Sequence, residues 1–467
     1  MKKILLVVSL FICIAAQAQK QSLNISLLAH WNDSTLNRCD ADQIWNDLTG
    51  WNDTIKKREY LIAGSCDSIY FFDITVDSVI KKCAVKEGHS RNSINRDYET
   101  YSHYVYCVSD RSSPVGSLQI FDLQYLPDSV HLVYDNDSLS VNTHTIFIEA
   151  KSKRAYLCSN IRGHMSGSSA MGILSLANPE HPVFIGELPV SSPCNLVHEV
   201  FVQNDTAYCS CGYNGLFIYD FKNAGNPIEI GSISPGYPYG GYNHSSWIDS
   251  TGKYLLFSDE LPFGMPIKIY NIHDIQNPVS VKTFNSNIGA TPHNADWKGR
   301  FAWTSSYEDG VYCYDLIDPS NPVVAGYYDT YMKNAPGSYF GFHGCWGVYC
   351  FLPSGKILAS DISEGLFVLK PSANLGINTF SQDKIHYSIY PNPLTENTII
   401  KITSTQNEDA LLSIFDVVGN VLIHKTIQLA NGENEIDLNE LNAFKNGMYF
   451  VQIKTISQVW NTKLMKQ

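Results

Sequence analysis

The amino-acid sequence predicts an all-β protein, a seven-bladed β-propeller followed by a small β-sandwich. One reason is composition: the 467 residues include 28 Tyr, 21 Phe and 8 Trp among many short β-branched runs, which favour strands. A second is a unit that recurs seven times between residues 45 and 369, since such self-similarity is typical of repeat folds. A third is the change of pattern after Pro371, where a separate set of strands begins.

The chain begins with a segment that has the features of an export signal. Met1-Lys2-Lys3 is positively charged, residues 4–16 are apolar, and Ala16-Gln17-Ala18 offers the small residues of a cleavage site. We therefore expect residues 1–18 to be a signal peptide that is removed. This apolar core is too short to span a bilayer, and no later stretch reaches 18 apolar residues, so we predict no transmembrane segment in the mature chain.

The predicted propeller covers residues 19–371. Each repeat contains an apolar run that commonly ends in Asp-Leu or a similar pair, and the seven runs lie at 69–74, 118–123, 172–176, 216–221, 267–272, 311–316 and 365–369. Their spacing of about 44–54 residues is near the period of propeller blades. Four runs continue into a Pro-containing turn and a further strand, so each unit is predicted to form a four-stranded blade. We expect Leu27–Trp31 to close the ring against the last repeat.

A histidine recurs at the start of the innermost predicted strand. The four instances are predicted metal ligands: His144, His198, His244 and His293. The corresponding positions in the first, second and seventh repeats are further predicted ligand-binding residues: Asp47, Asp97 and His343. In a propeller these strand starts converge on one end of the central channel, where imidazole and carboxylate can hold a divalent metal ion.

The histidine position also has a structural interpretation. An imidazole at a strand start can bond the backbone of the next blade, and repetition in every blade is what that role predicts. Both interpretations stay open on the sequence alone. No catalytic residue is assigned, because the chain has no Gly-x-Ser-x-Gly elbow, no His-Glu-x-x-His helix and no phosphate-binding glycine loop.

Other acidic positions and the cysteines receive simpler interpretations. Asp259-Glu260 ends a second strand, where carboxylate oxygens can bind calcium, but the pair is interpreted as solvated loop carboxylates, as are Asp110 and Asp361. Three of the twelve cysteines recur at one place in the repeat and are predicted to be small buried apolar residues: Cys107, Cys158 and Cys209. Cys209 with Cys211, and Cys345 with Cys350, are candidate metal or disulfide pairs. The formal net charge of −12 argues against a nucleic-acid partner.

Residues 372–386 are polar and predicted to be a linker, and residues 387–467 carry their own alternating strands. This C-terminal part resembles the type A sorting domain of the type IX secretion system of Bacteroidetes, on Tyr390-Pro391-Asn392-Pro393, residues 415–419, residues 447–451, and Lys463 and Lys466. The resemblance implies that the type IX machinery is a partner. It also implies delivery to the cell surface or the exterior.

The repeat region resembles the LVIVD-repeat propellers grouped as the choice-of-anchor B family. The resemblance rests on Asn46-Asp47, Arg96-Asp97, the His-led strands, Asp259-Glu260 and residues 351–369. Ser175 departs from it, standing where Asp is usual. The family implies a fold and no particular reaction. We therefore predict a secreted or cell-surface binding protein for an extracellular protein, glycan or small ligand. The alternative is a metal-dependent extracellular enzyme that uses the central His/Asp ring.

Overall fold

The computed structural model describes residues 22–40, 42–110, 116, 118–162, 167–333, 339–373, 375, 387–395, 398–404, 407–417, 420–454 and 459–466. The predicted signal peptide and most of the predicted linker lie outside these residues. The chain divides into two compact units, Met1–Gly376 and Ile377–Gln467. Strands dominate both units, and the all-β prediction is confirmed.

The described residues of the first unit form seven antiparallel sheets, each built mainly from four consecutive strands. The first sheet contains β3 (Trp45–Asp53), β4 (Arg58–Ser65), β5 (Ser68–Asp73) and β6 (Lys81–Glu87). The second contains β7 (Arg96–Tyr101), β8 (Tyr104–Ser109), β9 (Leu118–Asp122) and β10 (His131–Asn136). The third contains β11 (Ile146–Glu149), β12 (Arg154–Arg162), β13 (Gly167–Ser175) and β14 (Val183–Pro189). The fourth sheet contains β15 (Glu199–Gln203), β16 (Thr206–Ser210), β17 (Leu216–Asp220) and β18 (Ile228–Ile233). The fifth contains β19 (Tyr242–Ile248), β20 (Tyr254–Leu261), β21 (Ile267–Asn271) and β22 (Val279–Phe284).

The last two sheets of this unit also recruit the N-terminal strands. The sixth contains β23 (Ala295–Lys298), β24 (Phe301–Ser305), β25 (Val311–Asp315), β26 (Val323–Tyr328) and β1 (Ser22–Leu23); the seventh contains β27 (Cys345–Tyr349), β28 (Ile357–Asp361), β29 (Gly365–Pro371) and β2 (Ile25–Trp31). Because β2 pairs with β29, with His30 opposite Phe367, the predicted pairing of Leu27–Trp31 with the last repeat is confirmed.

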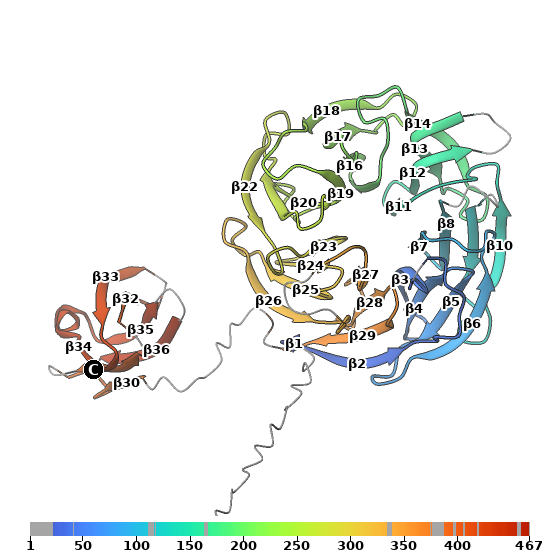
Figure 1. Cartoon of the computed structure of the whole chain (residues 1–467). Coiled ribbons are helices and arrows are strands. Elements are labelled where there is room, and N and C mark those ends of the chain that lie inside the picture. Colours follow the sequence, from blue (N-terminus) through green and yellow to red (C-terminus); the bar gives the residue numbers. More distant parts are fainter. Residues whose placement is uncertain are drawn as a thin grey trace, which may run out of the picture. The chain divides into compact units, whose positions relative to one another are not determined.

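The first strands of the seven sheets contact one another around a centre. β3 contacts β7, the contacts continue through β11, β15, β19, β23 and β27, and β27 contacts β3 again. Figure 1 shows these strands innermost, with the later strands of each sheet toward the outside. The arrangement is β-propeller-like, and it brings the residues before each innermost strand toward one central region.

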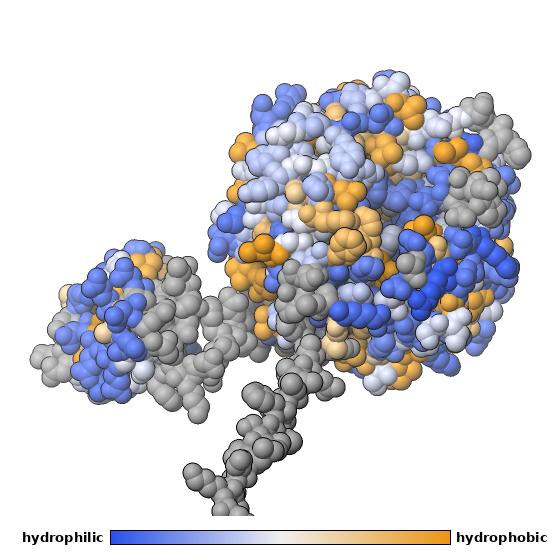
Figure 2. All heavy atoms as spheres, viewed as in Figure 1, coloured by the Kyte–Doolittle hydropathy of each residue, from blue (hydrophilic) through white to orange (hydrophobic). Residues whose placement is uncertain are grey.

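Apolar side chains are buried between neighbouring sheets. One cluster joins Tyr60 and Phe71 of the first sheet to Val105 and Phe121 of the second, all with at most 1% exposure. Burial of each such aromatic ring contributes about 2 kcal/mol, so these clusters hold adjacent sheets together. On the face in view in Figure 2, hydrophilic side chains cover much of the surface, while hydrophobic ones gather, among other places, over β20, β23 and β24.

Two disulfides fasten loops of the first unit. They join Cys39 to Cys66 and Cys194 to Cys211, with Cα atoms 5.5 and 5.4 Å apart. Cys107, Cys158 and Cys209 are free and buried, as predicted. The two candidate pairs were wrong, because Cys211 bonds to Cys194, and Cys345 and Cys350 are both free. Disulfides of this kind are typical of proteins that leave the cytoplasm.

The second unit consists of two sheets that share one apolar core. One holds β30 (Tyr387–Tyr390), β31 (Ile399–Ser404) and β34 (Gly432–Asp437); the other holds β33 (Val421–Leu429), β32 (Glu408–Phe415), β35 (Gly447–Lys454) and β36 (Val459–Lys466). Ile400 and Ile402 of one sheet and Leu412 and Ile414 of the other belong to the same buried cluster. A short 3₁₀ helix, Asn439–Ala443, is the helix found among the described residues. No helix in the described part of the chain has the length and apolar character needed to cross a membrane.

Candidate functional site

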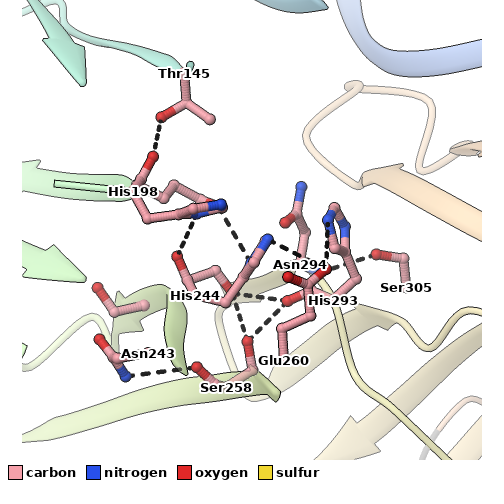
Figure 3. A network of polar contacts seen from close by, with 12 residues as sticks. Thr145, His198, Asn243, His244, Ser258, Glu260, His293, Asn294 and Ser305 are labelled. Atoms are coloured by element: carbon pink, nitrogen blue, oxygen red, sulfur yellow. Dashed lines mark hydrogen bonds and ion pairs between the residues drawn. The ribbon is translucent and has the colours of Figure 1, made fainter. Parts of the chain in front are cut away.

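Four imidazoles lie in a continuous row at the centre of the first unit. His144, His198 and His293 immediately or closely precede β11, β15 and β23, and His244 lies in β19. Successive ring centroids along the row are 4.2, 4.1 and 4.2 Å apart. The structure therefore brings together all four predicted metal ligands, and Figure 3 shows three of them at close range.

The row is also tied to the backbone of the neighbouring sheets. Nδ1 of His198 donates to the carbonyl oxygen of His244 at 3.2 Å, and Nδ1 of His293 donates to that of Trp346 at 2.7 Å. Thr145 donates through its hydroxyl to the carbonyl oxygen of His198 at 2.8 Å. These bonds join the third sheet to the fourth, the fourth to the fifth and the sixth to the seventh, which is the structural role that repetition predicts. They also fix Nε2 as the ring nitrogen that carries a lone pair in His198 and His293.

Strand register shows which residues share the histidine position. The residue just after it lies opposite a serine in three sheets: Glu199 opposite Ser210, Ser245 opposite Ser258 and Gly347 opposite Ser360. The equivalent of His198 and His244 in the seventh sheet is therefore Trp346. In the second sheet Asn95 makes the bond that a histidine makes elsewhere, because its amide donates to the carbonyl oxygen of His144 at 2.6 Å. The predicted register was wrong for His343 and Asp97, because the loop before β27 and the start of β7 are offset from the other repeats.

A cavity of about 400 Å³ lies on one side of the row. Its lining includes all four histidines and, among the described residues, five carboxylates and no Lys or Arg: Asp47, Asp97, Glu99, Glu199 and Asp296. Two predicted ligand-binding residues, Asp47 and Asp97, thus lie here. Aromatic rings of Phe147, Trp247, Trp346, Tyr349 and Phe351 complete much of the wall.

The carboxylates of this cavity repel one another and are withdrawn from bulk water. Burial raises the pKa of Glu99 to about 8 and raises the pKa of Asp97, Glu199 and Asp296 well above their usual range, with neighbouring carboxylates adding to the shift. Asp97 is also tied down, since its Oδ2 accepts from the backbone N–H of Ile146 at 2.6 Å. A cation in the cavity would relieve this repulsion.

A second cavity, of about 260 Å³, lies against the same four histidines. It is lined in addition by Glu260 and Tyr307 and by the loop residues Asp40, Asp42 and His343. The structure therefore places His343 beside the histidine row, although on a different cavity from Asp47 and Asp97. The row forms a boundary shared by both cavities.

The interpretation of Asp259 and Glu260 as solvated loop carboxylates was wrong. Both belong to β20, where Asp259 is fully buried and Glu260 is 9% exposed. Oε1 of Glu260 accepts a hydrogen bond from the hydroxyl of Tyr307 at 2.6 Å. The same oxygen lies 3.8 Å from Nε2 of His244 and 3.8 Å from Nε2 of His293 (Figure 3).

The imidazoles around Glu260 are held neutral. Burial lowers the pKa of His293 to about 3 and lowers the pKa of His244 and His198 well below the usual range, with the neighbouring imidazoles adding to the shift for His244 and His198. In the described part of the structure, Nδ1 of His244 is buried without a hydrogen-bond partner, 4.0 Å from Oε2 of Glu199. The possible metal-ligand atoms form two clusters, and within each cluster they all lie within 4.8 Å of one another. One cluster is His198, Glu199 and His244, and the other is His244, Glu260 and His293.

The remaining two predicted loop carboxylates differ from each other. Asp110 is partly exposed and lies 3.0 Å from Nδ1 of His144, the end of the row. Asp361 is fully buried at the end of β28, accepts from the hydroxyl of Thr330 at 2.7 Å, and was therefore misassigned as solvated. Burial raises the pKa of Asp361 to about 7.

Comparison with protein families identifies the second unit. Residues 388–467 match the model of the secretion system C-terminal sorting domain. The predicted sorting domain is confirmed. Asn392, in the Tyr390-Pro391-Asn392-Pro393 motif, is hydrogen-bonded to the last strand, β36. Its side-chain amide donates to the carbonyl oxygen of Lys463 and its side-chain oxygen accepts from the N–H of Met465, both at 2.9 Å. The sorting domain implies delivery to the cell surface or the exterior.

Two solved structures are distantly similar to this chain. One is PorZ, an essential bacterial surface component of the type-IX secretion system of Porphyromonas gingivalis, with 11% identity and a TM-score of 0.46. That match covers 90% of this chain, which spans 59% of the PorZ chain. Another is the computationally designed Ika8 protein, with 7% identity, a TM-score of 0.44, and coverage of 73% of this chain and 98% of that one. No curated protein matches the chain.

Proposed function

We propose that the first unit is a seven-bladed propeller spanning residues 19–371, of the LVIVD-repeat, choice-of-anchor B type. A signal peptide at 1–18 precedes it, and a linker at 372–386 joins it to a β-sandwich sorting domain at 387–467. The closed circle of contacts between innermost strands supports the blade count. The shared core of the two C-terminal sheets supports the sandwich.

The propeller is a binding module for a small organic cation at the cell surface or outside the cell. The carrying observation is the 400 Å³ cavity, which has five carboxylates and no Lys or Arg among its described lining residues. Its volume suits a small ligand. Its aromatic walls, such as Trp247 and Trp346, suit the apolar part of such a ligand and can contact a cationic head through their ring faces.

Isothermal titration of the purified chain with diamines, polyamines, arginine esters and quaternary ammonium compounds tests the binding. At least one compound is expected to bind, with affinity that falls as salt rises. Asp97→Asn and Glu199→Gln are expected to weaken binding at least tenfold, whereas exposed Glu229→Gln leaves it unchanged. Binding of none of these cations, or preferential binding of anionic glycans, would contradict the proposal.

Export has its own test. A chain lacking residues 387–467 is expected to accumulate in the periplasm, while the intact chain reaches the cell surface or medium. Normal surface delivery of the shortened chain would show that the sorting domain is dispensable. Cell fractionation with surface proteolysis distinguishes the two outcomes.

A metal-dependent extracellular enzyme is the second candidate, favoured by the meeting of His244, His293 and Glu260 at a cavity. A metal ion there would activate water as a nucleophile. This candidate predicts that a bound compound is chemically changed after incubation with the metal-loaded chain. A binding protein returns the compound intact, and mass spectrometry of the recovered ligand separates the two.

A further inference from the structure

We propose that His244, His293 and Glu260 form a binding site for one divalent first-row transition-metal ion, open to the second cavity. The site combines two of the repeated histidines with Glu260, a carboxylate that the sequence predicted to be solvated. It excludes His144 from the ligand set, although His144 belongs to the same row. His244 and His293 line both cavities, but Glu260 lines the second cavity and not the first, so variants of Glu260 test this site apart from the organic-cation site.

The three ligand atoms converge without touching. Nε2 of His244 and Nε2 of His293 are each 3.8 Å from Oε1 of Glu260. Zinc and similar ions hold nitrogen and oxygen ligands at about 2.1 Å, so tetrahedral ligands lie roughly 3.4 Å apart. An inward movement of a few tenths of an ångström would bring these atoms to coordinating distance. Two imidazoles and one carboxylate are ligands that suit zinc, iron, nickel or manganese.

Hydrogen bonds already hold two of the three ligands, His293 and Glu260, in position. Nδ1 of His293 donates to the carbonyl oxygen of Trp346 at 2.7 Å, which leaves Nε2 free to bind an ion. The hydroxyl of Tyr307 donates to Glu260 at 2.6 Å and fixes the carboxylate. Hydrogen bonds of this kind orient ligands in metal sites and increase their basicity.

The neighbouring cluster of His198, Glu199 and His244 is an alternative metal site, and it shares His244 with the proposed site. It would use Nδ1 of His244, which lies 4.0 Å from Glu199. We favour the Glu260 cluster because its carboxylate is anchored by Tyr307 and lies equally far from two Nε2 atoms. Three protein ligands at the edge of a cavity leave at least one coordination position for water or another small ligand.

Metal analysis of the tag-free full chain tests the site. The chain is stripped with chelator, dialysed against Zn²⁺ or Mn²⁺, and measured by elemental mass spectrometry. About one ion per chain is expected, and Co²⁺ should give the visible spectrum of a nitrogen- and oxygen-coordinated site. Glu260→Gln and His293→Gln should lose the ion, whereas the matched control His198→Gln should keep it.

Tyr307→Phe provides a variant that leaves all three ligands in place. It should weaken metal binding about 10- to 100-fold, because it releases the carboxylate from its anchor. Melting temperatures in chelator report whether each variant is folded, and Glu260→Asp replaces Glu260→Gln if the latter fails to fold. Glu199→Gln should keep the ion even where it abolishes binding of an organic cation, so the two proposals fail separately.

Three results would overturn the assignment. One is the absence of stoichiometric metal in the intact chain after loading. A second is retention of the ion by both Glu260→Gln and His293→Gln. A third is loss of the ion from His198→Gln and Glu199→Gln with retention by Glu260→Gln, which would place it in the neighbouring cluster.

Discussion

The ammonium group of Lys268 lies 2.8 Å from the carboxylate of Asp259, and both side chains are completely buried. Asp259 also accepts from the hydroxyl of Tyr237 at 2.8 Å and from the amide of Asn243 at 3.1 Å. Lys268 donates a second bond to the carbonyl oxygen of Pro266 at 2.8 Å. This network joins β20 and β21 to the loop before β19.

Removing one partner of this pair leaves the other charge buried and unpaired. Lys268→Met is expected to lower the free energy of unfolding by about 3–5 kcal/mol, and the double variant Asp259→Asn/Lys268→Met by less. Exposed Lys222→Met should change it by no more than about 0.5 kcal/mol. Chemical denaturation measures all three. A cost for Lys268→Met no larger than that for Lys222→Met would mean that the pair contributes nothing.

Asp361 makes stability depend on pH. Burial raises its pKa to about 7, against about 3.9 in an unfolded chain. Between these values the folded state retains a proton that the unfolded state has released, so the free energy of unfolding falls as pH rises from about 4 to about 7.

The Asp361→Asn variant lacks this titration. The stability of the intact chain relative to this variant is therefore expected to fall by roughly 2–3 kcal/mol between about pH 5 and about pH 8. Denaturation curves at several pH values, with exposed Asp128→Asn as control, measure the difference. A difference that is constant with pH would show that Asp361 is ionised throughout.

The Cys39–Cys66 disulfide closes a loop with a sequence separation of 27 residues. In the chain-entropy model, Cys39→Ser/Cys66→Ser costs about 3–4 kcal/mol because the unfolded chain gains freedom. Denaturation of the oxidised chain and of the double variant measures this cost. Cys83→Ser, which changes a free and half-buried thiol, should have a small effect. Equal losses for the two variants would contradict the predicted role.

Asn392 anchors the sorting motif to β36 through two backbone hydrogen bonds. Asn392→Ala is expected to lower the stability of the second unit by about 0.5–1.5 kcal/mol, since two solvent-exposed hydrogen bonds to the backbone are lost. Hydrogen exchange at the amide of Met465 should accelerate, while amides in the first unit stay unchanged. Asn420→Ala, in a local turn with Asp416, is the control. Unchanged exchange at Met465 would show that the motif does not hold this strand.

Much of the fold could be predicted because the third strand of each repeat is buried on both faces. Such strands form nearly continuous apolar runs, and the predicted runs at 69–74 and 267–272 coincide closely with β5 and β21. Register was harder to predict. The inner strands β7 and β27 are offset from those of the other repeats, so Asn95 and Trp346 take the place of the histidine there. The pattern of apolar residues does not reveal such offsets.

The histidine row could be predicted because it repeats, whereas its carboxylate partners do not. The spacing of Asp97 and Glu99 indicates that they lie close together, since residues two apart on a strand share one face. Glu260 stands out in the sequence as half of the acidic pair Asp259-Glu260, but that pair does not show that its carboxylate is buried beside the histidines. Its burial depends on Tyr307, from the next sheet, and a contact between sheets cannot be read from one repeat.

The pairing of β2 with β29 joins opposite ends of the first unit. The hydroxyl of Ser26 bonds the carbonyl oxygen of Lys370 across 344 residues of sequence. No shorter piece of the chain can complete the seventh sheet, so the circle stays open until residues beyond 365 have been synthesised and brought back to the start. Contacts of such long sequence separation form late and slowly. Completion of the circle therefore requires both ends of the first unit to be present together, since β2 and β29 belong to the same sheet.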